Sequence, residues 1–178
     1  MAWLIIVAVL LLAIGPILMA MPSAKDKRLA ALRAQARQRG LSVQMTQLPH
    51  PTPTAAQQVS AAGVRRTPLL TCAAYRLPLR HLIDQDEAPA SGGNWRLQRR
   101  SGAQLAGLPV DWEWFPESAA RDAPDGIAAL PATLADDVLA IEGARGSVAV
   151  YWQETPGIGL DKLVALLHAL REIQQARS

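Results

Sequence analysis

The chain has 178 residues, of which 50% are apolar and 19% are charged, a composition typical of one globular domain. Its one cysteine, Cys72, excludes an internal disulfide framework and any zinc site built from cysteines. Residues 21–40 carry six basic side chains and one acid, whereas the rest of the chain carries 12 basic and 14 acidic residues. This local basic block argues against a nucleic-acid binder, which spreads its basic residues over the folded surface.

The first element is an apolar stretch over residues 2–20 that contains no charged residue. A helix needs about 20 apolar residues to cross the hydrocarbon core of a bilayer, and no basic residue precedes the stretch as it would in a signal peptide. The sequence therefore predicts a transmembrane anchor over residues 1–21. Because the basic residues follow the anchor, the positive-inside rule predicts a single-pass protein of a bacterial inner membrane, with a periplasmic N-terminus and a cytoplasmic C-terminal domain.

The basic block over residues 22–40 is predicted to form a juxtamembrane helix. Ser23 is its expected N-cap and Gly40 its expected stop. Cations this close to a bilayer can bind anionic headgroups, or they can act only as determinants of topology. The candidate headgroup contacts are Lys25, Lys27, Arg28, Arg33, Arg37 and Arg39.

Residues 41–178 are predicted to form an α+β domain. Polar and apolar residues alternate over 41–48, which favours a half-buried strand, and a mobile loop rich in Pro, Thr, Ala and Gln follows over 49–67. Further strands are predicted over 69–77, 94–100 and 110–114, with a loop over 84–93. A short helix is expected over 126–135, and strands 138–141 and 147–153 form a hairpin.

The last predicted element is an amphipathic helix that begins at Leu160. Its apolar residues recur at helical spacing, so they form one broad stripe that must pack on another element. A sheet is the obvious partner. The predicted fold is therefore a small domain of antiparallel strands packed by this C-terminal helix, behind the transmembrane helix and the basic helix. The residues of the stripe are Leu160, Leu163, Val164, Leu167, Leu170 and Ile173.

Known catalytic motifs are absent from the sequence. It contains no phosphate-binding loop, no His-Glu-x-x-His and no Gly-x-Ser-x-Gly. His50, His81 and His168 lie far apart, and the acidic pair Asp136-Asp137 is interpreted as a solvated turn. Glu142 is interpreted as the polar edge of a strand beside Gly143. We therefore predict no catalytic residue, no cofactor, no metal site and no small-molecule ligand.

The segment from Asp111 to Glu117 is the most distinctive in the chain because it gathers Trp112, Trp114 and Phe115 between acidic residues. Exposed aromatic residues with a polar rim are typical of protein-docking surfaces. The alternative interpretation is a core strand whose tryptophans pack under the last helix. The three aromatic residues are the candidate docking residues.

The layout of the chain resembles that of uncharacterised single-pass inner-membrane proteins of gammaproteobacteria. The residues that carry the resemblance are Pro22-Ser23 with the basic helix, Trp112-Glu113-Trp114, and the segment 150–154 before the last helix. In topology only, the chain is similar to the YajC-type accessory subunit of the Sec translocase. That family is shorter and lacks the C-terminal half found here, so the resemblance assigns no functional residue.

The predicted function is that of a membrane-anchored, non-enzymatic protein. Its cytoplasmic domain would bind an unidentified protein or accompany a larger membrane complex, and no nucleic acid is expected as a partner. Three alternatives remain open: an accessory component of preprotein translocation, a membrane-tethered enzyme with an unrecognised site, and a sensor of lipid surfaces that uses residues 23–39.

Overall fold

The computed structural model describes Trp3 and residues 23–79, 94–155 and 157–176. The chain divides into two compact units, Met1–Gln35 and Ala36–Ser178. The predicted loop over 84–93 and His81 lie outside the described residues. The candidate site described below belongs entirely to the second unit.

The basic segment forms helix α2 over Ala24–Gln38, which confirms the predicted helix and its start. The Ser23 hydroxyl accepts a hydrogen bond from the Asp26 N–H at 3.2 Å, and the Ser23 N–H donates to the Asp26 carboxylate at 3.1 Å. Each side chain thus accepts a hydrogen bond from the backbone N–H of the other residue, as in a capping box. The side-chain and backbone hydrogen bonds of Ser23 hold the pKa of Asp26 below its ordinary value.

The predicted fold class is corrected in its first element. Within the described ranges, every helix is too short or too polar to cross a membrane; α2, for example, has only 15 residues and is interrupted by charged side chains. The transmembrane helix had been predicted over residues 1–21, of which only Trp3 is described. The fold class that the structure supports is α+β, and the membrane assignment that rested on the predicted helix has no support in it.

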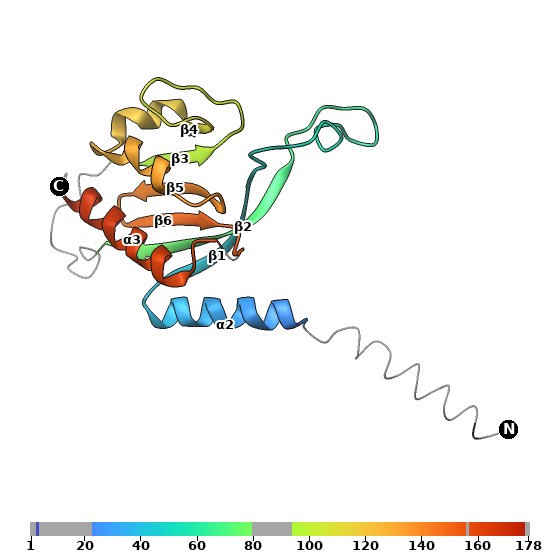
Figure 1. The fold of residues 1–178 in the computed structure, drawn as a ribbon, viewed down its shortest axis with the longest axis horizontal. Helices are drawn as coiled ribbons and strands as arrows, with labels where there is room; N and C mark the ends of the chain where they lie inside the picture. Colours follow the sequence, from blue (N-terminus) through green and yellow to red (C-terminus); the bar gives the residue numbers. More distant parts are fainter. Residues whose placement is uncertain (1–2, 4–22, 80–93, 156, 177–178) are drawn as a thin grey trace. The chain divides into compact units, whose positions relative to one another are not determined.

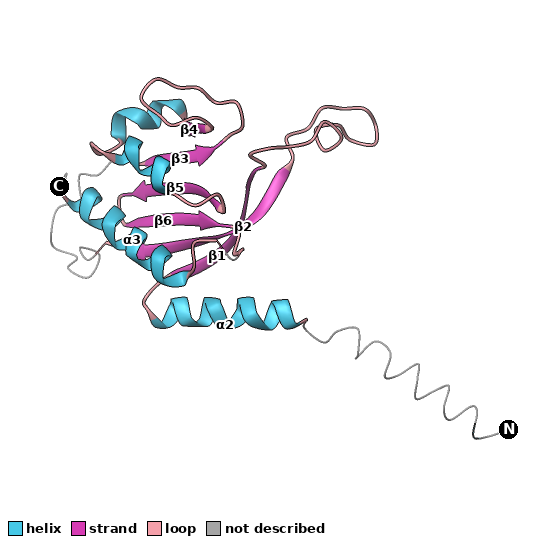
Figure 2. Ribbon diagram, in the orientation of Figure 1, coloured by secondary structure: helices cyan, strands magenta, loops and turns pink. Residues whose placement is uncertain are grey.

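A six-stranded antiparallel sheet forms the centre of the second unit, with strand order β1-β2-β6-β5-β3-β4 (Figures 1 and 2). All six strands were predicted, with small shifts of their ends. Strand β4 is the shortest of the six. The other five strands come from segments with alternating or continuous apolar residues, the patterns that predict strands. Their bounds are β1 Ser42–Pro49, β2 Leu69–Pro78, β3 Trp95–Arg99, β4 Trp112–Trp114, β5 Val138–Ala144 and β6 Ser147–Trp152.

The described residues of this unit after β1 form helix α3 over Leu160–Gln175 and two 3-10 helices, η2 over Glu117–Asp122 and η3 over Ile127–Thr133. The predicted C-terminal helix is confirmed. It packs on β6 and β2 through buried residues of the predicted stripe, Leu163, Leu167 and Leu170 (Figure 1). The helix predicted over 126–135 is a 3-10 helix, and Pro131 lies inside it.

The face of the sheet under α3, here called the helix face, holds Tyr75 and the tryptophans of the strands. The rings of Tyr75 and Trp152 lie 5.7 Å apart, and the Trp95 indole donates a 2.7 Å hydrogen bond to the buried Gln174 side chain. A Cβ atom on Gly143 would lie 2.3 Å from the Trp95 ring. Glycine at position 143 therefore makes room for the indole.

The opposite face of the sheet, here called the second face, combines an apolar cluster with a row of polar residues. The apolar cluster is formed by Leu48, Cys72, Ala74, Leu139, Ala140, Ala149 and Tyr151, with Leu70 against it. The polar residues stand on neighbouring strands, because Arg96 lies opposite Glu142 and Gln98 lies opposite Glu113 in the strand register. Two residues of this polar row, Gln98 and Glu113, belong to the candidate site.

Candidate functional site

Glu142 is the centre of an ionic cluster on the second face. Its Oε1 accepts a 2.9 Å bond from Arg76, and its Oε2 accepts bonds from Arg96 at 2.6 Å and from the Tyr151 hydroxyl at 2.7 Å. The Glu142 side chain is 11% exposed, while those of Arg76 and Arg96 are 30% and 28% exposed. Two arginines thus share one carboxylate, and the cluster has a net positive charge.

The pKa values in this cluster follow from burial and hydrogen bonding. Burial acts to raise the pKa of Glu142, but the hydrogen bonds from Tyr151 and Arg96 and the charges of both arginines together lower it. For Tyr151, burial followed by the bond and charge of Glu142 raises the pKa to about 12. Glu142 is therefore a carboxylate and Tyr151 a neutral donor at neutral pH.

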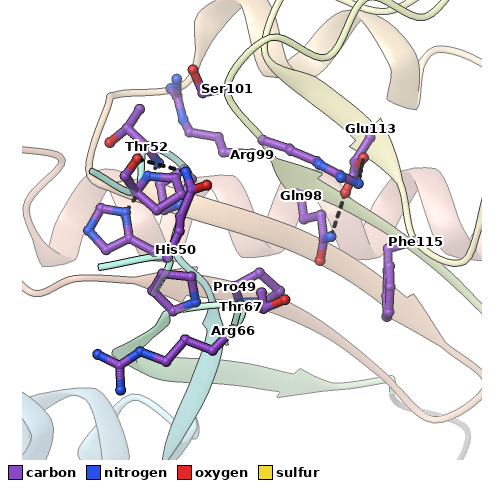
Figure 3. Close-up of a pocket in the computed structure, with 15 residues that line it drawn as sticks. Pro49, His50, Thr52, Arg66, Thr67, Gln98, Arg99, Ser101, Glu113 and Phe115 are labelled. Atoms are coloured by element: carbon purple, nitrogen blue, oxygen red, sulfur yellow. Dashed lines mark hydrogen bonds and ion pairs between the residues drawn. The ribbon is translucent and has the colours of Figure 1, made fainter. Parts of the chain in front are cut away.

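A second feature of this unit is a cavity of about 710 Å³, which the four residues of the ionic cluster do not line. One wall belongs to the arm, defined here as residues 50–68 between β1 and β2, and the other wall to the ends of β3 and β4 (Figure 3). A 2.8 Å hydrogen bond from the Ser101 N–H to the Pro51 carbonyl joins the two walls. The lining residues are Pro49, His50, Pro51, Thr52, Pro53, Gln58, Arg66, Thr67, Pro68, Gln98, Arg99, Arg100, Ser101, Glu113 and Phe115.

Gln98 is the most informative residue of the cavity wall. It is 5% exposed, and its Nε2 donates a 2.8 Å hydrogen bond to Oε1 of Glu113. Within the part of the chain that is described, its Oε1 is buried and has no hydrogen-bond partner. Buried polar atoms are nearly always paired, so this unpaired acceptor is unusual for a protein interior.

The apolar part of the cavity comes from Phe115 and from the prolines of the arm. Phe115 is 49% exposed, and the Arg96 guanidinium lies 5.9 Å from the centre of its ring. Figure 3 shows Pro49 and His50 on one side of the cavity and Phe115 on the other. Proline has a fixed φ angle, so this wall loses little conformational entropy when a ligand binds.

The three predicted docking aromatics have different surroundings. Trp112 is 1% exposed and lies on the helix face, 5.0 Å from the Arg99 guanidinium, so it belongs to the core and is removed from the docking candidates. Trp114 is half-buried, and Phe115 lines the cavity. Successive residues of a strand point to opposite faces of the sheet. Trp112 and Trp114 therefore lie on the helix face, and Phe115 lies on the second face.

The six predicted headgroup contacts lie on or just after α2. Lys25, Lys27, Arg28 and Arg37 are exposed, and Arg33 is half-buried. Arg39 forms an ion pair at 2.5 Å with Asp161 at the start of α3. The structure thus gives Arg39 a partner within the second unit.

Two acidic residues have roles that the sequence interpretation missed. Asp137 was interpreted as part of a solvated turn, but it is 7% exposed and its Oδ2 accepts bonds from Trp152, Thr155 and Ile158. Glu142 was interpreted as a strand edge, but it is buried inside β5. The signal available for Glu142 was its position between apolar residues of a strand, where an acid needs a buried partner.

Metal binding finds no support in the described ranges. His, Cys, Asp and Glu form no cluster of three there that could hold a metal ion. Burial, and then the charge of Glu154, raises the pKa of the Cys72 thiol to about 11, so the thiol remains protonated and weakly nucleophilic at neutral pH. The chemistry that the cavity supports is hydrogen bonding and charge pairing with a bound molecule.

No family model, no curated protein and no solved structure matches this chain. The resemblance to inner-membrane proteins therefore stays a prediction. The function has to be inferred from the geometry of the cavity.

Proposed function

We propose that the second unit is a non-enzymatic binding domain that holds a segment of a partner protein in the cavity between the arm and strands β3 and β4. The observation that carries this proposal is the buried Oε1 of Gln98, which lacks a hydrogen-bond donor within the described ranges. Leaving such an acceptor unpaired costs about 1–3 kcal/mol. A ligand that supplies an N–H group at this point recovers that free energy.

A polypeptide segment suits the shape and the chemistry of the cavity. Its volume of about 710 Å³ falls within the range of roughly 300–1,000 Å³ that is typical of ligand sites. A peptide supplies a backbone N–H at nearly every residue, which is the donor that Gln98 requires. Its apolar side chains can pack on Phe115 and on the prolines of the arm.

The ionic cluster holds Arg96 in place beside Phe115, a residue of the cavity wall. Arg96 joins Glu142 to the ring of Phe115, and Glu142 lies in β5 at the middle of the sheet. A wall residue whose neighbour is held by a partly buried ion pair needs little reorganisation when a ligand arrives. The cluster is therefore assigned a positioning role.

The test is a selection of peptides from a phage-displayed random library against the full-length chain, followed by affinity measurements on the enriched peptides. We expect Gln98→Leu to weaken binding about tenfold, which corresponds to ~1.4 kcal/mol. The matched control is Gln47→Leu, which changes an exposed glutamine of β1 outside the cavity and should leave the affinity unchanged.

A second pair of variants guards against misfolding of the Gln98 variant. Phe115→Ser should also weaken binding, whereas Val110→Ser removes an even more exposed apolar side chain that does not line the cavity. Circular dichroism should show folded protein for all four variants. The proposal is overturned if no peptide is enriched, or if the enriched peptides bind both cavity variants as tightly as the unchanged chain.

A further inference from the structure

We infer that the segment held in the cavity is acidic, so that its aspartate or glutamate carboxylates pair with Arg66 and Arg100 while its backbone N–H donates to Gln98. This inference rests on the proposed function and adds the chemical class of the partner. Three observations support it: the net charge around the cavity, the state of each arginine, and the hydroxyl groups between them.

The second face and the arm carry more positive than negative charge where they meet. Three arginines, namely Arg66, Arg99 and Arg100, line the cavity together with one carboxylate, that of Glu113. The excess of two positive charges contrasts with the acidic excess of the chain outside residues 21–40. A surface of one sign favours a partner of the opposite sign and speeds its arrival.

The individual arginines differ in how much of their hydrogen-bonding capacity is already used. Arg99 is fully engaged, because its guanidinium donates to the carbonyls of Val138 and Ala135 and lies against Trp112. Arg66 instead uses Nε to bind the Gln57 carbonyl, and no described residue bonds its terminal nitrogens. Arg66 can therefore bind a carboxylate through both terminal nitrogens.

Arg100 stands at the opposite rim. Its side chain is 69% exposed, and one terminal nitrogen binds Oε2 of Glu113 at 3.1 Å. The same Glu113 accepts the Gln98 amide through Oε1, so Glu113 links Arg100 to the residue whose buried Oε1 is unpaired among the described residues. An acidic side chain from the ligand would be a second partner for the Arg100 guanidinium.

Hydroxyl groups add to the polar lining of the cavity. Thr52 and Thr67 line the arm side of the cavity, and Ser101 lines the side of β3. Figure 3 shows Thr52 and Ser101 at the same end of the cavity. Hydroxyls donate to carboxylate oxygens, whereas a lysine or arginine of a ligand would face the excess positive charge.

The test compares three fluorescein-labelled peptides of equal length that carry glutamate, glutamine or lysine at the same positions and are otherwise identical. Fluorescence anisotropy with the full-length chain should give the tightest binding for the glutamate peptide. We expect the glutamine peptide to bind about tenfold more weakly and the lysine peptide to show no binding. The affinity for the glutamate peptide should fall as the salt concentration rises, because exposed charge pairs are screened.

Two neighbouring arginines supply a matched pair of variants. Arg66→Gln should weaken binding of the glutamate peptide about fivefold. Arg65→Gln removes the same charge from the adjacent residue, which does not line the cavity, and should have a much smaller effect. Equal effects of the two variants would mean that only net charge matters and would overturn the assignment of Arg66.

The remaining outcomes separate this inference from the proposed function. If the glutamine peptide binds as tightly as the glutamate peptide and Gln98→Leu weakens both, the binding function stands and the acidic partner is excluded. If library-selected peptides bind but none of the three designed peptides does, the binding function again stands and the acidic partner is again excluded. If an oligothymidylate displaces the glutamate peptide and binds more tightly, a nucleic acid is the ligand and both proposals fail.

Discussion

The indole of Trp152 donates a 2.7 Å hydrogen bond from Nε1 to Oδ2 of Asp137, a residue that lies 15 positions earlier in the chain. The same oxygen accepts bonds from the Thr155 hydroxyl at 3.2 Å and from the Ile158 N–H at 3.0 Å. One carboxylate thus links the segment before β5 to the end of β6 and to the connection into α3. This connection sets where α3 begins on the helix face.

Replacement of Asp137 by alanine should destabilise the domain by about 3 kcal/mol, because three donors lose their acceptor and two of them are buried. Urea unfolding followed by circular dichroism measures the loss. Asp136→Ala is the matched control, since Asp136 is fully exposed and makes only a 3.3 Å ion pair with Arg99. The free energy of unfolding should stay nearly unchanged in that variant, and a similar loss in both variants would contradict the role given to Asp137.

Glu142→Gln should cost about 2–3 kcal/mol at neutral pH. The variant leaves Arg76 and Arg96 without a counter-charge, and the expected loss is below that of a fully buried pair because both arginines are nearly one-third exposed. Glu117→Gln, at an exposed acid of η2, should leave stability unchanged. Equal urea midpoints for Glu142→Gln and the unchanged chain would contradict this assignment.

The contribution of Glu142 should also depend on pH with a definite sign. Since its pKa is lowered from 4.5 in the folded protein, the carboxylate contributes its full stability above pH 4.5. That contribution is lost as the pH falls through the lower folded pKa. The difference in unfolding free energy between the unchanged chain and Glu142→Gln should therefore shrink below pH 4.5. A difference that stays constant down to pH 3 would show that ionisation of Glu142 does not matter.

Tyr151 should ionise near pH 12, about two units above an ordinary tyrosine. Burial, the hydrogen bond to Glu142 and its negative charge all oppose a second anion at this point. The stability from the neutral hydroxyl is complete below pH 10 and is lost as the pH rises toward 12. Ultraviolet titration of tyrosinate should lose its highest-pH transition in Tyr151→Phe. Loss of a transition near pH 10 instead would contradict the prediction.

Cys72 should react slowly with thiol reagents in the folded protein. It is 2% exposed and its thiol pKa is raised to about 11, so few molecules carry an accessible thiolate at pH 8. Because it is the one cysteine in the chain, a coloured disulfide reagent reports on it alone. We expect one equivalent to react rapidly in denaturant and slowly without it, and equal rates would show that the second face is open at Cys72.

The strands and helices could be predicted because their signals are local. Alternation predicted β1, and the helical spacing of leucines predicted α3 together with the residues that it buries. Strand β4 begins later than predicted, at Trp112, because Asp111 has a φ angle of 67° and its carboxylate accepts the Gly102 N–H at 2.7 Å. Val110 is left 65% exposed outside the strand.

The burial of polar side chains was less predictable. Asp137 and Asp136 are adjacent and chemically identical, yet one is 7% exposed and the other has a fully exposed side chain. Glu142 is buried because Arg76 and Arg96 reach it from β2 and β3, strands that lie 66 and 46 residues away in the sequence. Such pairing depends on which strands become neighbours, and local periodicity does not carry that information.

The sequence by itself determined the elements of this protein, since the spacing of apolar residues and the caps at helix ends act over a few residues. Only the tertiary structure decided the cavity, because Gln98 and Glu113 meet the arm through the antiparallel order of the sheet. Hydrophobic burial drives each element to cover its apolar side. The cavity arises where distant strands then bring polar groups together and leave Oε1 of Gln98 buried without a partner among the described residues.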